Sequence, residues 1–150
     1  MEQSELDASL SPQLGTVRKL SPRQRARLAV EIVVAYLRAQ RALRRAPIAS
    51  VVERLRSGGP PVSARNGYAF AEALRLGRAV VRTLKLVPGD TRCLRRSLVL
   101  IQLLAKRGIP ARLVIAARAD PDFLAHAWVE YDGEPVLSPA GDSFGRLVEL

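Results

Sequence analysis

The chain has 150 residues, of which 48% are hydrophobic and 25% charged, a composition that suits one soluble globular domain with its own core. A single cysteine excludes an internal disulfide and fits a reducing compartment, and no apolar run approaches the ~20 residues of a membrane-spanning helix. The net charge of +10 favours anionic partners, but dispersed basic residues and few aromatic rings argue against nucleic acid, and we expect no membrane partner either.

The first part of the chain is predicted to be a tail followed by a long helix. Residues 1–20 show no sustained period and no apolar signal-peptide core, which favours a mobile tail and a cytoplasmic protein. Ser21 and Pro22 are typical of a helix N-cap and first helical residue, so we expect a helix from there to about Arg45. Its predicted inner face consists of Leu28, Ile32, Val33, Tyr36, Leu37 and Leu43. We interpret the arginines around the rest as a solvated basic face, with a peptide-docking face as the alternative.

A glycine- and proline-rich break predicts a boundary after a second, shorter helix. That helix is expected to start at Pro47, and residues 57–61 then read Ser-Gly-Gly-Pro-Pro. We therefore expect two parts: residues 1–57 as a tail and helical segment, and residues 64–150 as the main domain.

A further helix is predicted from about Asn66 to Leu86. Its expected inner face consists of Phe70, Leu74, Val81 and Leu84. Gly77 lies inside this helix, where glycine costs roughly 1 kcal/mol relative to alanine. We therefore expect close packing or a kink at that position.

The next helix carries the only cysteine at its start. Asp90 or Thr91 is predicted to be its N-cap, which places Cys93 in the first turn, and Gly108 is predicted to end it. A helix N-terminus favours negative charge, and the thiolate is the reactive form of cysteine. Cys93 is thus a candidate nucleophile, with a buried apolar thiol as the commoner alternative for a lone cysteine.

The last part of the chain is predicted to form a small antiparallel sheet. Residues 111–117 are apolar and β-branched, and residues 125–131 alternate, so both segments are expected to be strands. The alternation gives one face with His126, Trp128 and Glu130 and another with Ala127, Val129 and Tyr131. Asp132-Gly133 predicts a hairpin turn into a strand at residues 135–138, and a short closing element follows. Helices followed by a sheet indicate an α+β fold.

Cys93 and His126 are the only cysteine and histidine of the chain. Their helix-then-strand order can bring them together as a cysteine nucleophile and its general base. A metal site would need carboxylates such as Asp90 or Glu130 to complete a compact set of three or four ligands, so we expect no metal. No glycine-rich phosphate loop is present, and we expect no cofactor.

Three segments carry a resemblance to a known family. They are Cys93–Leu98 (CLRRSL), Leu103–Ile115 (LLAKRGIPARLVI) and Ala125–Glu130 (AHAWVE), the last followed by an Asp-Gly turn. Together they resemble the transglutaminase-like cysteine peptidase of lasso peptide biosynthesis, in its stand-alone form. The resemblance implies a transglutaminase-like, papain-like peptidase core behind an N-terminal helical segment. It implies that Cys93 attacks the scissile carbonyl and that His126 transfers the proton.

The same resemblance implies a biological role. The family removes the leader from a ribosomally made precursor peptide, which a small leader-recognition protein delivers. A separate ATP-dependent cyclase then closes the macrolactam ring. The sequence alone does not separate hydrolysis from another acyl transfer, because the same pair of side chains serves both reactions.

The third catalytic residue is where this sequence departs from the family. The family has an aspartate at the position of Ser138, and a serine can orient an imidazole but cannot balance its charge. A two-residue hairpin turn would pair Ser138 with Ala127, whereas a bulge would pair it with His126. Asp142 and then Glu130 are the alternatives. The departure motivates a second hypothesis, a catalytically degenerate binding module for a peptide or another anionic partner.

Overall fold

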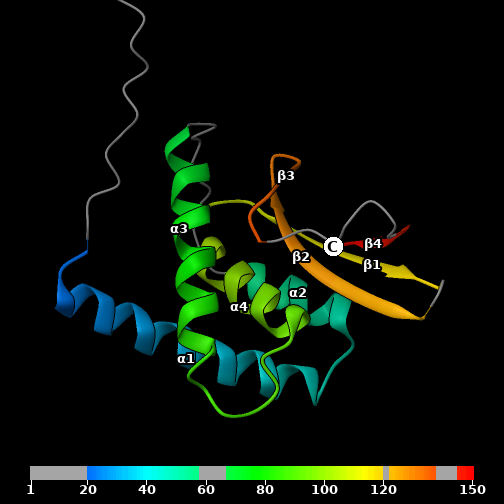
Figure 1. Cartoon of the computed structure of the whole chain (residues 1–150), viewed down its shortest axis with the longest axis horizontal. Coiled ribbons are helices and arrows are strands. Elements are labelled where there is room, and N and C mark those ends of the chain that lie inside the picture. The colour runs from blue at the N-terminus through cyan, green and yellow to red at the C-terminus, as the bar shows by residue number, and fades with distance from the viewer. Residues whose placement is uncertain (1–19, 58–66, 120–121, 138–144) are drawn as a thin grey trace, which may run out of the picture.

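The computed structural model describes residues 20–57, 67–119, 122–137 and 145–150, and the predicted N-terminal tail lies almost wholly outside them. The described elements are α1 (Pro22–Leu43), α2 (Ile48–Arg56), α3 (Gly67–Leu84), α4 (Cys93–Lys106), β1 (Arg112–Arg118), β2 (Leu124–Tyr131), β3 (Glu134–Pro135) and β4 (Gly145–Glu149). The helices gather on one side of an antiparallel sheet (Figure 1), so the predicted α+β fold is confirmed. None of the helices within these residues is long and apolar enough to cross a bilayer.

Helix α1 begins where its capping residues predict. The Ser21 hydroxyl accepts a hydrogen bond from the Gln24 backbone N–H at 3.3 Å, and the Gln24 side chain accepts one from the Ser21 N–H at 2.9 Å. The buried face consists of Leu28, Ile32, Ala35, Tyr36 and Ala39. The prediction for Leu37 is wrong, since its side chain is 55% exposed. The two alanines occupy the inner face there, and the Gln102 amide of α4 reaches the Ala35 carbonyl oxygen at 3.0 Å.

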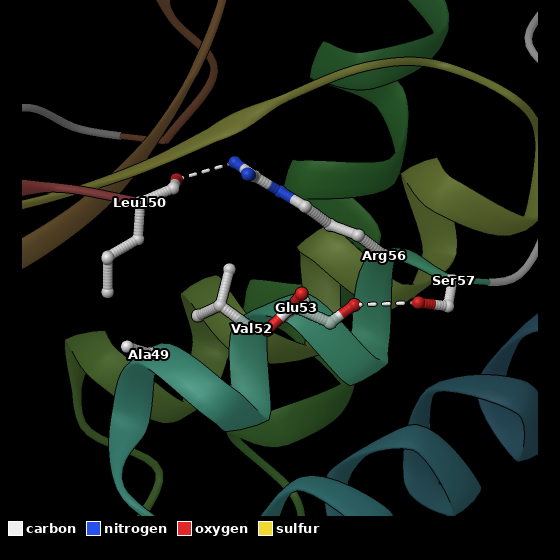
Figure 2. Close-up of a pocket in the computed structure, with 6 residues that line it drawn as sticks. All are labelled: Ala49, Val52, Glu53, Arg56, Ser57 and Leu150. Carbon is white, nitrogen blue, oxygen red and sulfur yellow. Dashed lines mark hydrogen bonds between the residues drawn. The ribbon is translucent and has the colours of Figure 1, made fainter.

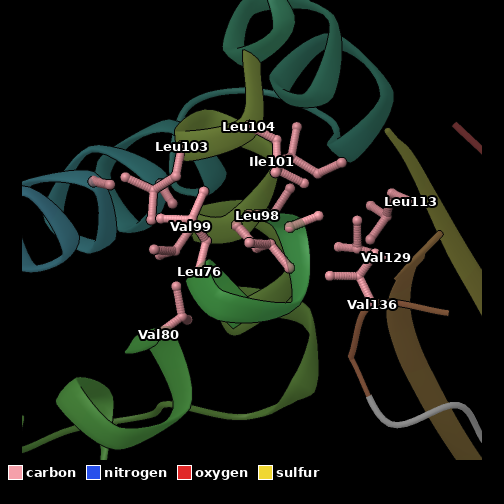
Figure 3. Close-up of a cluster of buried hydrophobic side chains, with 14 of the residues drawn as sticks. Leu76, Val80, Leu98, Val99, Ile101, Leu103, Leu104, Leu113, Val129 and Val136 are labelled. Carbon is pink, nitrogen blue, oxygen red and sulfur yellow. The ribbon is translucent and has the colours of Figure 1, made fainter. Parts of the chain in front are cut away.

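Helix α4 is the centre of the fold. It contacts the other three helices and strands β1 and β2, and its residues from Ser97 to Leu104 are buried without interruption. Figure 3 shows Leu98 and its neighbours on α4 packed between side chains of α3 and the sheet. Both predicted parts of the chain, 1–57 and 64–150, contribute side chains to this one core. The division between them stays a prediction.

Glu31 on α1 ties that helix to the end of α4. Its carboxylate lies 3.0 Å from the Arg107 guanidinium and 3.5 Å from the Lys106 amine. Partial burial raises the pKa of Glu31, but hydrogen bonds and charge from Arg107 and then Lys106 outweigh burial and leave that pKa below its ordinary value. The carboxylate form is therefore the one that stabilises the fold.

We expect Glu31→Gln to lower the free energy of unfolding by about 0.5–1 kcal/mol at neutral pH, as for a partly exposed ion pair. Because the folded-state pKa of Glu31 is depressed, this contribution is complete above the unfolded-state pKa and disappears as the pH falls through the folded-state value. The urea midpoints of wild type and variant should therefore converge once the pH lies below the depressed folded-state pKa of Glu31. Glu53→Gln, on the exposed surface of α2, is the matched control and should leave the midpoint unchanged. A gap between wild type and Glu31→Gln that persists in acid would contradict the assignment.

Helix α3 packs more closely than its apolar pattern predicts. Its buried residues are Ala69, Ala73, Leu76, Val80 and Leu84, whereas the predicted Phe70, Leu74 and Val81 are half-buried. A Cβ atom on Gly77 would lie 3.1 Å from the Val136 carbonyl oxygen and 3.3 Å from the Leu137 side chain. Close packing at Gly77 is thus confirmed, and it holds the segment after β3 against α3.

The sheet has the order β3-β2-β1-β4, with every neighbouring pair antiparallel. Leu113 of β1 pairs with Val129 of β2, and both side chains face the helices in the main core. The alternate residues face the other way: Val114, Ala116 and Trp128 form a second buried cluster on the far face. The two residues of a cross-strand pair point to the same face of the sheet. The register therefore decides whether each functional side chain of β2 faces the helices or the far side.

The hairpin after β2 has the predicted two-residue turn. Asp132 and Gly133 both have positive φ, 51° and 84°, which the Asp-Gly pair of a type I′ turn accommodates. The partner strand is shorter than predicted, because β3 covers only Glu134–Pro135 and proline lacks an N–H donor for the ladder. The Val136 N–H still donates to the Val129 carbonyl oxygen at 2.8 Å.

The predicted closing element is β4, which adds to the opposite edge of the sheet. It pairs with β1 rather than with the hairpin, and the register shifts between Ile115 and Ala116. This bulge brings Arg146 opposite Ala116 on the far face.

Candidate active site

Cys93 is the first residue of α4 and is half-buried against the main core. The prediction that Asp90 or Thr91 caps this helix is wrong. Arg92 is the N-cap, and no side chain bonds to the first-turn N–H groups. Asp90 instead accepts a hydrogen bond from the Arg92 N–H at 3.1 Å, which closes a turn just ahead of the helix. Backbone donors at the helix start are therefore left beside the thiol.

The charge around Cys93 is predominantly positive. The Arg95 guanidinium lies 2.9 Å from the Asp90 carboxylate and also donates to the Asp90 carbonyl oxygen at 2.8 Å. Arg92 is 89% exposed, and Arg96 is half-buried. Three arginines and one aspartate thus lie in this turn, which leaves it a net positive charge. Positive charge and the helix N-terminus both favour an anionic reaction intermediate at this position.

A buried serine joins the cysteine turn to the histidine strand. Ser97 lies one helical turn after Cys93, and its hydroxyl donates to the Ala127 carbonyl oxygen at 3.2 Å. Four residues of helix span about 6 Å, and His126 directly precedes Ala127. The hydrogen bond thus joins α4, one turn after Cys93, to the residue that follows His126 in β2. It also occupies the Ser97 hydroxyl, which leaves that serine unsuited to act as a nucleophile.

The imidazole of His126 lies on the face of the sheet away from α4. His126 pairs with Ala116, and its ring stacks on the Trp128 ring with centroids 6.0 Å apart and planes at 25°. The Cys93 sulfur has no hydrogen-bond partner within the described part of the chain. The structure therefore brings the backbone positions of the two residues into one region without a direct hydrogen bond between thiol and imidazole.

Trp128 is held in turn by a buried carboxylate and a late arginine. The Trp128 indole N–H donates to Glu130 at 2.8 Å, and the Arg146 guanidinium lies 2.8 Å from the same carboxylate, which is only 6% exposed. The guanidinium carbon of Arg146 lies 5.9 Å from the centre of the Trp128 ring. A hydrogen bond to Glu149, then the charge of Glu130, raises the pKa of Arg146. The Glu130 carboxylate is thus engaged by Trp128 and Arg146.

Sequence reasoning missed Arg146 altogether. The one signal available was the expected strand carboxylate at Glu130, because a buried acid requires a partner of opposite charge or a hydrogen-bond donor. The position of that partner depends on the β1–β4 register, which no local pattern encodes.

A family model described as the transglutaminase-like superfamily matches residues 16–149 of this chain. The chain belongs to that superfamily. Transglutaminase-like domains are generally cysteine peptidases and transglutaminases, and the α+β arrangement with a cysteine at a helix start fits them. No curated protein and no solved structure matches the chain.

Two predicted site residues of this transglutaminase-like domain, Ser138 and Asp142, lie outside the described residues. The hairpin has the two-residue turn rather than a bulge, but the pairing beyond Leu137 lies outside the described residues as well. The third catalytic residue therefore stays a prediction. Within the described ranges, no three His, Cys, Asp or Glu side chains gather as a metal site would require.

An open pocket of about 390 Å³ lies elsewhere on the transglutaminase-like domain. It is lined by Ala49, Val52, Glu53, Arg56, Ser57 and Leu150. Figure 2 shows Arg56 directed at the Leu150 carbonyl oxygen, and the same guanidinium donates to the Ala111 carbonyl oxygen at 2.6 Å. Burial and then the charge of Arg112 lower the pKa of Arg56. The pocket includes neither Cys93 nor His126, and its arginine joins α2 to the sheet.

Proposed function

We propose that this transglutaminase-like domain is a cysteine peptidase that removes the leader from a ribosomally synthesised lasso precursor peptide. The observation that carries the proposal is the position of the only cysteine, at an uncapped helix start that the Ser97–Ala127 hydrogen bond joins to the strand of the only histidine. The lasso assignment is supported by the resemblance of the Cys93–Leu98 and Ala125–Glu130 segments to that family.

The partners follow from the same proposal. A small leader-recognition protein delivers the precursor peptide, and an ATP-dependent cyclase acts on the cleaved core. A cytoplasmic location keeps the thiol reduced, since cytosolic thiol systems oppose disulfide formation.

The proposed reaction uses Cys93 as nucleophile and His126 as proton carrier. The Cys93 thiol gives its proton to the imidazole, and the sulfur attacks the scissile carbonyl carbon. The C–N bond breaks, and the imidazolium returns the proton to the leaving amine. A water molecule then hydrolyses the thioester, which releases the carboxylate and restores the thiol. Free N–H groups at the start of α4 stabilise the oxyanion. This mechanism requires the His126 imidazole to reach the Cys93 sulfur, a contact that the position of the ring on Trp128 does not itself provide.

A cleavage assay read by mass spectrometry tests the peptidase directly. We expect the wild-type protein, mixed with a lasso precursor peptide and its leader-recognition protein, to release a leader fragment that Cys93→Ala does not release. Without the recognition protein the fragment should form more slowly, because delivery raises the local concentration of substrate. Fragment release by Cys93→Ala, or none by wild type despite measurable precursor binding, would contradict the proposal.

A catalytically degenerate binding module is the second candidate function. The stacking of His126 on Trp128, on the face opposite α4, favours it, because an imidazole held there does not act on the thiol. This candidate predicts peptide binding that is unchanged by Cys93→Ala, with no product from either protein.

A further inference from the structure

The outward face of α1 carries exposed aliphatic side chains that the core does not use. Val30, Val34 and Leu37 are 63%, 39% and 55% exposed. Their spacing of four and then three residues places them in one row along the helix, opposite the buried face through Ile32 and Ala39. Helix α1 is therefore apolar on two sides, and only one of them packs against α4 and α3.

Exposed arginines flank this row at both ends. Before the row are Arg23 and Arg27, and after it are Arg38, Arg41 and Arg44. Within the described ranges, none of these five guanidinium groups forms an ion pair or a hydrogen bond. Five acids form ion pairs in the described ranges, and all their basic partners lie outside α1; the acids are Glu31, Glu72, Asp90, Glu130 and Glu149. The positive charge of α1 is thus uncompensated within the described structure.

We propose that this surface, Val30, Val34 and Leu37 with the five flanking arginines, binds an acidic amphipathic helix of a partner protein. We name it the α1 docking face. The chemistry requires an apolar centre to cover the aliphatic row and carboxylates at both ends to pair with the guanidinium groups. The inference does not depend on Cys93, so it holds for a peptidase and for a binding module alike.

The composition of the docking face favours a protein over other anionic partners. It has no aromatic side chain, so it offers no ring on which nucleic-acid bases can stack. The wide apolar face of α1 is already buried in the core, and three aliphatic side chains leave little to insert into a bilayer. An aliphatic row between two cationic ends does match the apolar centre and acidic ends of an amphipathic helix.

Fluorescence anisotropy with a synthetic probe tests the docking face on the full chain. The probe is a labelled helical peptide of about 18 residues, roughly 27 Å long, with leucines at positions i, i+4 and i+7 and glutamates at both ends. We expect binding that weakens about tenfold or more in Arg38→Glu/Arg41→Glu and also in Val34→Asp. Raising the salt from about 0.1 to 1 M should weaken it further, as the Debye length falls from about 10 to 3 Å.

The matched control is Arg54→Glu/Arg82→Glu, which changes the net charge equally at exposed positions on α2 and α3. It should bind the probe as wild type does, and circular dichroism should show that all variants keep their helices. Equal loss in both double variants would mean attraction by net charge alone and would overturn the proposal. Equal binding of a scrambled peptide, or of phosphatidylserine vesicles or duplex DNA in preference to the probe, would overturn it too.

Discussion

His126→Gln is expected to slow leader cleavage by about 10²–10⁴-fold, the range that a positioned general base contributes. Glutamine keeps a hydrogen-bonding side chain of similar size but neither takes the thiol proton nor returns it to the leaving amine. The variant should also react with iodoacetamide about tenfold more slowly than wild type at neutral pH, because the imidazolium no longer stabilises the Cys93 thiolate. Alkylation needs no substrate or partner, so it reports on the pair in the isolated protein.

Leu124→Gln is the control for this experiment. Leu124 lies on β2 two residues before His126, shares its face of the sheet and is 50% exposed. The control should cleave and alkylate as wild type does. If His126→Gln is alkylated at the wild-type rate, the imidazole that stacks on Trp128 does not serve the thiol. The binding module would then be the better description of the domain.

Local chemistry predicted the boundaries of several elements well. Ser21 and Pro22 mark the start of α1 through a capping box, and the positive φ of 67° at Gly108 marks the end of α4. The N–H groups of Gly108 and Ile109 bond to carbonyl oxygens of the last turn, as a Schellman motif requires. Asp132-Gly133 forms the expected turn for the same reason. Each signal acts within a few residues, so the sequence alone suffices.

Residues close in sequence do not determine which of the two apolar faces of α1 packs into the core. Leu37 is larger than Ala35 and raises the apparent apolarity of the wrong side. The short side chain of Ala35 instead allows α4 to approach closely enough for Gln102 to reach its carbonyl oxygen. That preference is set by the partner helix, so the periodicity of α1 by itself does not contain it.

In the candidate site, too, local patterns predicted some features, and long-range pairing set the others. Alternation along β2 correctly groups His126, Trp128 and Glu130, and a helix start correctly places Cys93 in a first turn. The side of the sheet on which α4 packs, and the delivery of Arg146 to Glu130, depend on strand pairings between distant parts of the chain. These pairings decide the orientation of the imidazole. The alternation of residues along one strand does not predict them.

Substitution of the buried Glu130 is expected to have a large effect on the stability of the fold. Glu130→Leu should lower the free energy of unfolding by about 2–4 kcal/mol, because the buried Trp128 N–H then has no acceptor and the pairing with Arg146 is lost. Glu130→Gln keeps an acceptor for the indole and loses only the charge, so we expect about 1 kcal/mol. Urea unfolding measures both, and Glu149→Gln is the control, since it removes an exposed carboxylate that bonds to the same Arg146.

The two Glu130 variants also separate stability from positioning of His126. If Glu130 acts through Trp128, Glu130→Leu should change the alkylation rate of Cys93 while Glu130→Gln leaves it close to wild type, because only the first frees the indole. Equal unfolding losses in Glu130→Leu and Glu149→Gln would show that burial of the carboxylate has no special importance. A large loss of stability with an unchanged alkylation rate would instead show that the Trp128–Glu130–Arg146 contacts stabilise the sheet and do not position His126. The imidazole would then be independent of the ring against which it rests.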